Sequence, residues 1–166
     1  MSNVFTNNIE FFFKENDGID FNLLENLIIN LVEEENCRVE IQGTYFGTQG
    51  GEMIFESKNF PPRDLIIKIN NLLSGFENLE RHLIELRWWD EGFNSVGAIA
   101  SSYQSNDIAY VESQEYFDPP EFGEDNYQTK WDKMIDEVQK EKKLCLEKAK
   151  KMLFDYIKLK KSVDIL

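Results

Sequence analysis

Four carboxylates that stand close together in the sequence have the chemistry to bind a cation. They are Asp118, Glu121, Glu124 and Asp125. Carboxylate oxygens are the ligands that calcium prefers, but these four lack the D-x-D-x-D-G spacing and the glutamate at position twelve of a calcium-binding loop. Acidic side chains are mostly solvated, so the spacing favours a solvated loop over a metal site. No metal or other cofactor is predicted.

The other residues with catalytic chemistry stand in unsuitable contexts. The single histidine, His82, lies in a predicted strand, far from any G-x-S-x-G turn that could supply a nucleophile. After the glycine-rich turn at residues 47–51, no Lys or Arg follows until Lys58. This indicates a hairpin turn and not a phosphate-binding loop. Cys37 and Cys145 lack a C-x-x-C spacing, which indicates buried thiols. The sequence therefore predicts a protein that is not an enzyme, although two of its many carboxylates could still meet in the fold.

A stretch without basic residues is the strongest functional feature. Residues 88–129 contain no Lys or Arg, but they contain nine carboxylates and nine aromatic side chains. Soluble surfaces normally mix both signs of charge, so this composition is unusual. Aromatic side chains supply contact area at a low entropy cost, and carboxylates attract a basic protein over a distance. The stretch therefore predicts a docking surface for a basic protein partner.

Within this stretch, the turn after Trp89 and the loop at residues 115–127 are the predicted contact regions. Neighbouring strand residues point to opposite faces of a sheet, so Trp88 and Trp89 cannot join the same core. The second tryptophan is either covered by a helix or exposed as an anchor for the partner. The predicted partner-binding residues are Trp89, Asp90, Glu91, Glu112, Glu115, Tyr116, Asp118, Glu121, Phe122, Glu124 and Asp125.

The whole chain is acidic, with a formal net charge of −13. The charge is uneven, because residues 1–129 sum to −17 and residues 130–166 to +4. An acidic body repels nucleic acid and anionic membranes, so neither is a predicted direct partner. The lysines near the C-terminus are interpreted as a solvated helix face, with nucleic acid or membrane contact as the alternative. A polar N-terminus and the lack of an apolar run of about 18 residues predict a soluble, cytoplasmic protein.

The elements that must position this surface belong to a single predicted domain, residues 1–166. Apolar spacing predicts a helical N-terminal part, residues 1–35, in which Asp20 caps the second of two helices. The first helix is predicted from Val4, Phe5, Ile9, Phe12 and Phe13. Residues 37–114 mostly alternate with period two, which predicts a hairpin and a three-strand meander, with one inserted helix between Pro62 and Gly75.

The last part of the chain combines a loop and a long helix. Residues 115–127 contain two prolines, a glycine and five acids, and form the predicted acidic loop. Thr129 caps a helix over residues 129–161, which would be about 48 Å long and must either bend near Lys142 or leave its last turns free of the body. The predicted fold is α+β, with an antiparallel sheet of about five strands, helices on one face and a long C-terminal helix. The other sheet face would be solvated or a docking face.

The size, acidity, α+β pattern and lack of a catalytic motif resemble those of bacterial immunity proteins. These neutralise polymorphic toxins or the toxins of contact-dependent growth inhibition, and the resemblance is one of profile over the whole chain. It implies a toxin–antitoxin pair, with a toxin encoded by a neighbouring gene and a tight one-to-one complex. The toxin domain is commonly a nuclease, and an RNase is favoured here.

Two classes of function explain the acidic aromatic stretch. In the first, the chain inhibits a toxin nuclease by occluding its cationic groove, with aromatic anchors and one cognate partner. In the second, it imitates the phosphates of a nucleic acid and binds DNA-binding or restriction proteins loosely, in a salt-dependent way. An enzyme of unrecognised type is a third interpretation.

Overall fold

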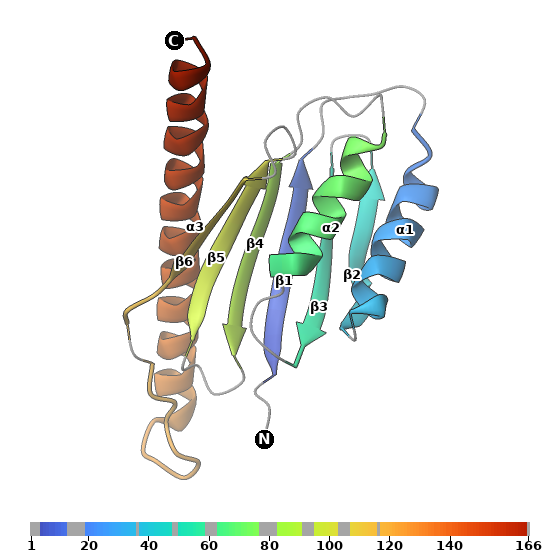
Figure 1. Cartoon of the computed structure of the whole chain (residues 1–166). Coiled ribbons are helices and arrows are strands. Elements are labelled where there is room, and N and C mark those ends of the chain that lie inside the picture. Colours follow the sequence, from blue (N-terminus) through green and yellow to red (C-terminus); the bar gives the residue numbers. More distant parts are fainter. Residues whose placement is uncertain are drawn as a thin grey trace.

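A sheet of six antiparallel strands, in the order β2-β3-β1-β4-β5-β6, forms the centre of the described structure (Figure 1). The computed structural model describes residues 4–12, 19–35, 37–47, 50–58, 63–76, 83–90, 95–102, 107–115 and 117–165. The elements in chain order are β1 (Phe5–Phe12), α1 (Phe21–Glu34), β2 (Arg38–Gly47), β3 (Gly50–Ser57), α2 (Arg63–Ser74), β4 (Leu83–Asp90), β5 (Val96–Ser102), β6 (Asp107–Glu112) and α3 (Tyr127–Ile165). The α+β class, the antiparallel sheet and the long C-terminal helix are confirmed, with one strand more than predicted.

The prediction of a first helix at the N-terminus is wrong, because those residues form strand β1. This strand lies between β3 and β4 and pairs with both. Its buried positions alternate with period two and are Phe5, Asn7, Ile9 and Phe11. Because Asn7 occupies one of these buried positions, the apolar residues alone do not alternate with the period of a strand. Phe12 is apolar although it is exposed, so the apolar residues together have a spacing that resembles a helix. Pairing with distant strands on both sides overrides the local pattern.

Helices α1 and α2 cover one face of the sheet (Figure 1). The Asp20 carboxylate caps α1 by accepting hydrogen bonds from two backbone amides at 3.1 Å, which satisfies donors that the helix leaves free. The helix then directs Leu24, Ile28 and Val32 into the core. The sheet meets them with a row of directly paired, fully buried residues: Met53, Ile9, Leu86 and Ile99.

Helix α3 packs on the opposite face, over β4, β5 and β6. Ile99 of β5 belongs to the core under α1 and α2, whereas the next residue, Ala100, packs against Ala149 and Leu153 of α3. Successive strand residues point to opposite faces, so β5 lies between two helical layers. The prediction of helices on one face therefore holds for α1 and α2, and α3 covers part of the face that was expected to be open.

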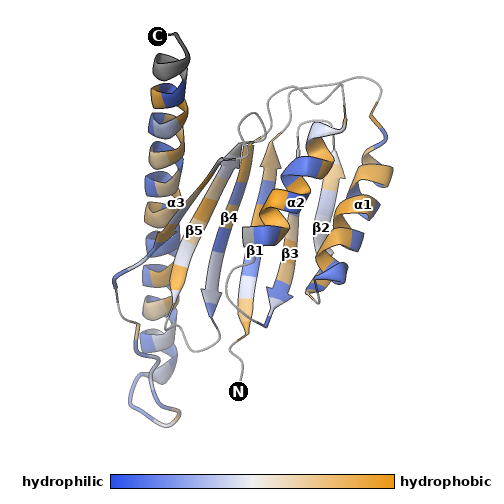
Figure 2. Ribbon diagram, viewed as in Figure 1, coloured by the Kyte–Doolittle hydropathy of each residue, from blue (hydrophilic) through white to orange (hydrophobic). Residues whose placement is uncertain are grey.

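Helix α3 is longer than the sheet that it covers. It spans 39 residues, about 58 Å at 1.5 Å per residue. The helix is continuous through Lys142, so of the two predicted alternatives it leaves its last turns beyond the strands (Figure 1). Figure 2 shows that apolar residues continue into those turns. In the C-terminal part of α3, Met152, Tyr156 and Leu159 are each at least half exposed.

Candidate partner-binding site

The acidic loop, residues 117–126, connects the end of the sheet to α3 at one end of the molecule (Figure 1). A tight turn shapes it, in which the amide of Glu124 donates to the carbonyl of Glu121 at 3.1 Å. Gly123 and Asn126 have φ angles of 97° and 59°, in the left-handed region that glycine and asparagine tolerate best. The loop therefore has a turn structure that its own residue types favour.

Phe117 anchors the acidic loop to the body. Its side chain is only 7% exposed and packs in a cluster with Val96 of β5 and with Met134 and Val138 of α3. A buried phenylalanine contributes several kcal/mol to packing, so it holds the start of the loop against the helix.

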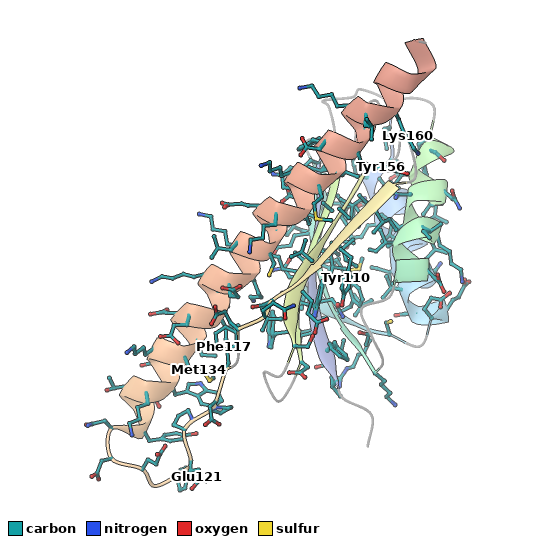
Figure 3. The ribbon with its side chains drawn as sticks, turned by 60° about the vertical axis from the view of Figure 1, so that its left-hand side comes forward. Tyr110, Phe117, Glu121, Met134, Tyr156 and Lys160 are labelled. Atoms are coloured by element: carbon teal, nitrogen blue, oxygen red, sulfur yellow. The ribbon has the colours of Figure 1, made fainter. Side chains whose placement is uncertain are left out.

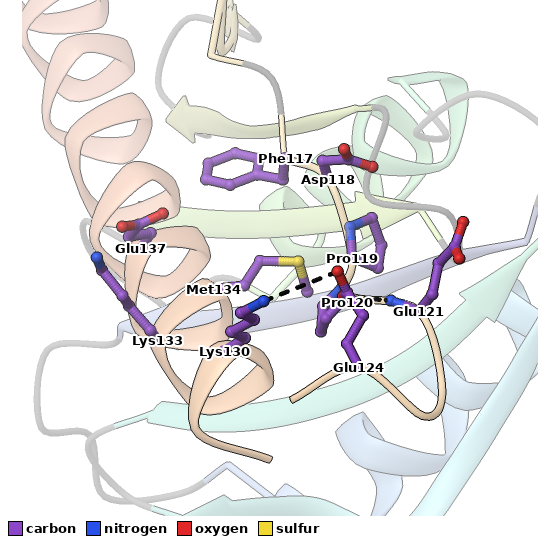
Figure 4. A pocket seen from close by; sticks show the side chains of 10 residues that line it. All are labelled: Phe117, Asp118, Pro119, Pro120, Glu121, Glu124, Lys130, Lys133, Met134 and Glu137. Carbon is purple, nitrogen blue, oxygen red and sulfur yellow. Dashed lines mark hydrogen bonds and ion pairs between the residues drawn. The ribbon is translucent and has the colours of Figure 1, made fainter. Parts of the chain in front are cut away.

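A hollow of about 470 Å³ lies between the acidic loop and the first turns of α3 (Figure 4). The lining side chains that matter here are Phe117, Pro119, Pro120, Glu124, Lys130 and Met134. The Nζ atom of Lys130 lies 3.7 Å from Oε1 of Glu124, and both side chains are about half exposed, so the ion pair is weak. Both apolar and charged side chains line the hollow, and such a mixture suits a side chain that protrudes from a protein partner.

Three aromatic rings lead from the tip of the loop towards the core. Phe122 stands at the tip and is 93% exposed. Its ring lies edge-on to Tyr127 at 5.7 Å between centroids, and Tyr127 stacks on Trp131 at 6.2 Å. Trp131 in turn packs against the cluster around Phe117. The buried end of the row supports the exposed end, so Phe122 is presented in a defined position.

The acidic loop that carries Phe122 also carries four exposed carboxylates. They are Asp118, Glu121, Glu124 and Asp125. One carboxylate oxygen of Glu124 accepts a hydrogen bond from the amide of Glu121 at 2.8 Å, which orients it within the loop. Between residues 115 and 141 the sequence has nine acidic residues against three lysines, so the local field is negative.

The structure brings together about half of the predicted contact residues. Asp118, Glu121, Phe122, Glu124 and Asp125 lie on the acidic loop, and Glu115 is exposed just before it. Glu112 is exposed at the end of β6, where its carboxylate accepts a hydrogen bond from the Ser95 hydroxyl at 2.9 Å. Glu91 and Tyr116 lie outside the described residues.

Two predicted contact residues, Trp89 and Asp90, do not lie on an exposed surface. Asp90 is 1% exposed, and its amide donates to the carbonyl of Ser95 at 3.0 Å. Trp89 is half-buried between the sheet and α3, whereas Trp88 is fully buried in the core under α1 and α2. A helix therefore covers each tryptophan, because helices lie on both faces of the sheet. Among the described aromatic residues of the predicted stretch, Phe122 is the most exposed, at 93%.

A buried lysine, Lys142 of α3, lies next to Trp89. The sequence pattern indicated this position only as a place where the helix could bend. It is 3% exposed, and its Nζ atom lies 3.6 Å from the centroid of the Trp89 ring. Burial, and then the charge of Arg87, lower the pKa of Lys142 to about 8. Arg87 itself pairs with Glu10 at 2.9 Å.

The thiols and the carboxylate groups of the described residues give no support for nucleophilic or metal chemistry. Cys37 and Cys145 are free and buried, and burial raises the pKa of both, that of Cys145 to about 11. Protonated thiols are weak nucleophiles. Across the described ranges, no group of three or more His, Cys, Asp or Glu side chains could hold a metal ion. No helix in the described part of the chain is long and apolar enough to span a bilayer. His82 lies outside that part.

Comparisons with family models, with curated proteins and with solved structures found no match for this chain. The site combines an exposed aromatic ring, a hollow and carboxylates of one sign, features that suit recognition of a basic protein.

Proposed function

We propose that this protein is an immunity-type inhibitor that binds a basic toxin, a nuclease with an RNase as the favoured class, and occludes its active site. The observation that carries the proposal is Phe122, a ring that is 93% exposed at the tip of an acidic loop. A partner that buries such a ring removes roughly 150–200 Å² of apolar surface from water. This is worth about 4 kcal/mol before the costs of association are subtracted.

The carboxylates around Phe122 support a basic partner of this kind. A nuclease binds the phosphates of its substrate in a cationic groove. The exposed acids of the loop carry negative charge, as those phosphates do, and can bind the same groove. Such complementarity raises the association rate and orients the encounter, while the aromatic anchor contributes more to lifetime. The proposed inhibitor therefore acts by covering the groove and needs no chemistry of its own.

The profile of the chain supports the same class. Its size, acidity and α+β pattern resemble those of immunity proteins of toxin–antitoxin and contact-dependent inhibition systems. The proposal includes a one-to-one complex in the cytoplasm, where the toxin would act, without direct contact to nucleic acid or membrane and without a cofactor.

The test is co-expression with the basic protein encoded by the neighbouring gene. We expect the chain to restore growth and, when purified, to abolish RNA cleavage by that protein at a one-to-one ratio. If it instead binds unrelated basic proteins equally well, and all binding is lost in moderate salt, the nucleic-acid mimic replaces the inhibitor.

A matched pair of variants tests the surface. The loop variant combines Asp118→Asn, Glu121→Gln, Glu124→Gln and Asp125→Asn. The control changes the same number of exposed acids elsewhere: Glu33→Gln, Glu34→Gln, Asp64→Asn and Glu147→Gln. The loop variant should slow association with the toxin at least about tenfold, and the control should change it much less. Equal effects would mean that only net charge matters and that the acidic loop is not the contact.

A further inference from the structure

Strand β6 is the last strand of the sheet on the side of α3, and no described strand pairs with its outer edge. The amide of Ser113, next after β6, donates to the carbonyl of Val96 at 2.8 Å. Bonded positions alternate along an antiparallel pair, so Val111 also bonds to β5. By the same alternation, the backbone N–H and C=O groups of Ile108 and Glu112 point away from the sheet.

Between its two acidic ends, Asp107 and Glu112, this edge has no lysine, proline or bulge. Edge strands generally carry a lysine, a proline or a bulge, which prevents another strand from adding. The opposite edge, β2, has a register shift between Glu40 and Tyr45. Strand β6 has the sequence DIAYVE and pairs regularly with β5 over all six residues. It therefore offers a regular, mainly apolar edge.

The side of α3 that faces this edge is identified by two contacts. Oε1 of Glu141 accepts a hydrogen bond from the Ser113 hydroxyl at 2.8 Å, so Glu141 faces the β6 side. Lys150 pairs with Glu85 of β4 at 2.7 Å, on the other side of the helix. At about 100° per residue these two positions are about 180° apart around the helix, in agreement with the contacts.

Exposed apolar side chains continue along the β6 side of α3. Met152 and Leu159 lie within about 20° of Glu141 around the helix by the same spacing. They are 52% and 62% exposed. Figure 3, which brings this side of the molecule forward, shows Tyr156 on α3 near the upper end of β6 and Glu121 at the lower end of the same side. The apolar stripe formed by Met152 and Leu159, the edge of β6 and the acidic loop therefore lie along the same side of the molecule.

We propose that an extended segment of the basic partner adds to β6 as a further antiparallel strand. The inference rests on the proposed function, because the same partner would contact the acidic loop, which follows β6 closely in the chain. A second copy fits less well. Two-fold pairing centred on β6 would place Glu112 of one copy opposite Ile108 of the other and would bring together two bodies of formal charge −13.

The geometry of the edge specifies the pattern of the added strand. Residues directly opposite each other in a sheet share a face, and Ile108 and Glu112 have their side chains on the α1–α2 face. Partner residues that bond to β6 therefore also point to that face, where a basic side chain meets Glu112. The alternate residues point to the face of α3, where apolar side chains meet Met152. The segment should alternate basic and apolar residues.

The probe is a blocked heptapeptide of alternating lysine and valine, added to the full-length protein while amide hydrogen exchange is followed by NMR. We expect exchange at Ile108 and Glu112 to slow at least about tenfold, with no change at Val111, which already bonds to β5. Two matched peptides sharpen the test. N-methylation of the lysines should abolish protection, because their amides face β6, and N-methylation of the valines should leave it intact.

Each other outcome has a definite meaning. Peptide-induced shifts confined to the acidic loop, without protection at Ile108 and Glu112, would overturn the inference and leave the inhibitor proposal standing. Protection that appears without peptide and grows with protein concentration would assign the edge to a second copy and overturn the partner strand. Protection by the peptide together with failure to inhibit the neighbouring toxin would refute the proposed function and retain the strand-accepting edge.

Discussion

Replacement of Lys142 by methionine should stabilise this protein. The lysine is 3% exposed between the sheet and α3, where the like charge of Arg87 adds to the cost of burying its ammonium group. Methionine has a similar length, carries no charge and packs favourably against aromatic rings such as that of Trp89. The substitution therefore removes the cost of burying a cation while it keeps the volume filled.

The magnitude follows from the pKa. Burial lowers the pKa of Lys142 from 10.5 to about 8, a difference that corresponds to about 3 kcal/mol against the folded state at neutral pH. The contact with the Trp89 ring at 3.6 Å offsets roughly 1–2 kcal/mol of this cost. Lys142→Met should therefore raise the free energy of unfolding by about 1–2 kcal/mol at pH 7.

The pH dependence has a definite sign. The folded-state pKa lies below the unfolded value, so between about pH 8 and 10.5 the unfolded chain holds more protons than the folded protein. The cost is therefore fully present below pH 8 and disappears as the pH rises towards 10.5. The advantage of Lys142→Met should shrink over that window, as measured by urea unfolding of both proteins at matched pH values.

The control is Lys143→Met, which removes the same charge from an exposed position and should change the free energy of unfolding by less than about 0.5 kcal/mol. A destabilised Lys142→Met protein, or an advantage that stays constant from pH 7 to 10.5, would refute the reasoning. Either result would mean that the ammonium group is solvated in the folded protein.

Three other substitutions test packing and recognition. Phe117→Ala should lower the free energy of unfolding by about 3 kcal/mol in urea titrations, because the ring is 7% exposed and anchors the acidic loop. Phe122→Ala should leave that free energy unchanged within about 0.5 kcal/mol but weaken the toxin complex at least tenfold in calorimetry. Gly97→Ala should fail to fold or lose several kcal/mol, because its Cβ would lie 2.3 Å from the ring of Trp88. A stable Gly97→Ala protein would contradict the packing of β5.

The strands that could be predicted are those in which apolar and polar residues alternate with period two within the strand itself. Strands β4, β5 and β6 form the three-strand meander that was predicted, because alternation and turn residues are local signals. Helix α1 was predicted from the same kind of signal, since Asp20 caps it. Strand β1 was not, because Asn7 fills one of its buried positions. The partners that make this strand stable lie at least 38 residues away in the sequence.

The exposed residues of the candidate site were harder to predict than its location. Two prolines and a glycine indicate the loop directly, but the exposure of an aromatic ring depends on where α3 packs. Ala98, Ala100 and Ala109 form a small-residue patch on the face of β5 and β6 that α3 covers. Small side chains allow a helix to approach closely, so this patch is the sequence signal for a second helical layer. Once α3 lies there, Trp89 is covered, and Phe122 is the exposed ring of the loop.

The two proposed contacts also limit the kind of partner. From Tyr127 to Leu159 the helix rises about 48 Å at 1.5 Å per residue. A strand paired with the six residues of β6 covers only about 20 Å. One partner that reaches both the acidic loop and the apolar stripe must therefore be a folded domain that contributes one edge segment. An isolated basic peptide should reproduce the amide protection at β6 without the affinity of the complete toxin domain, because most of the surface around Phe122 would stay exposed.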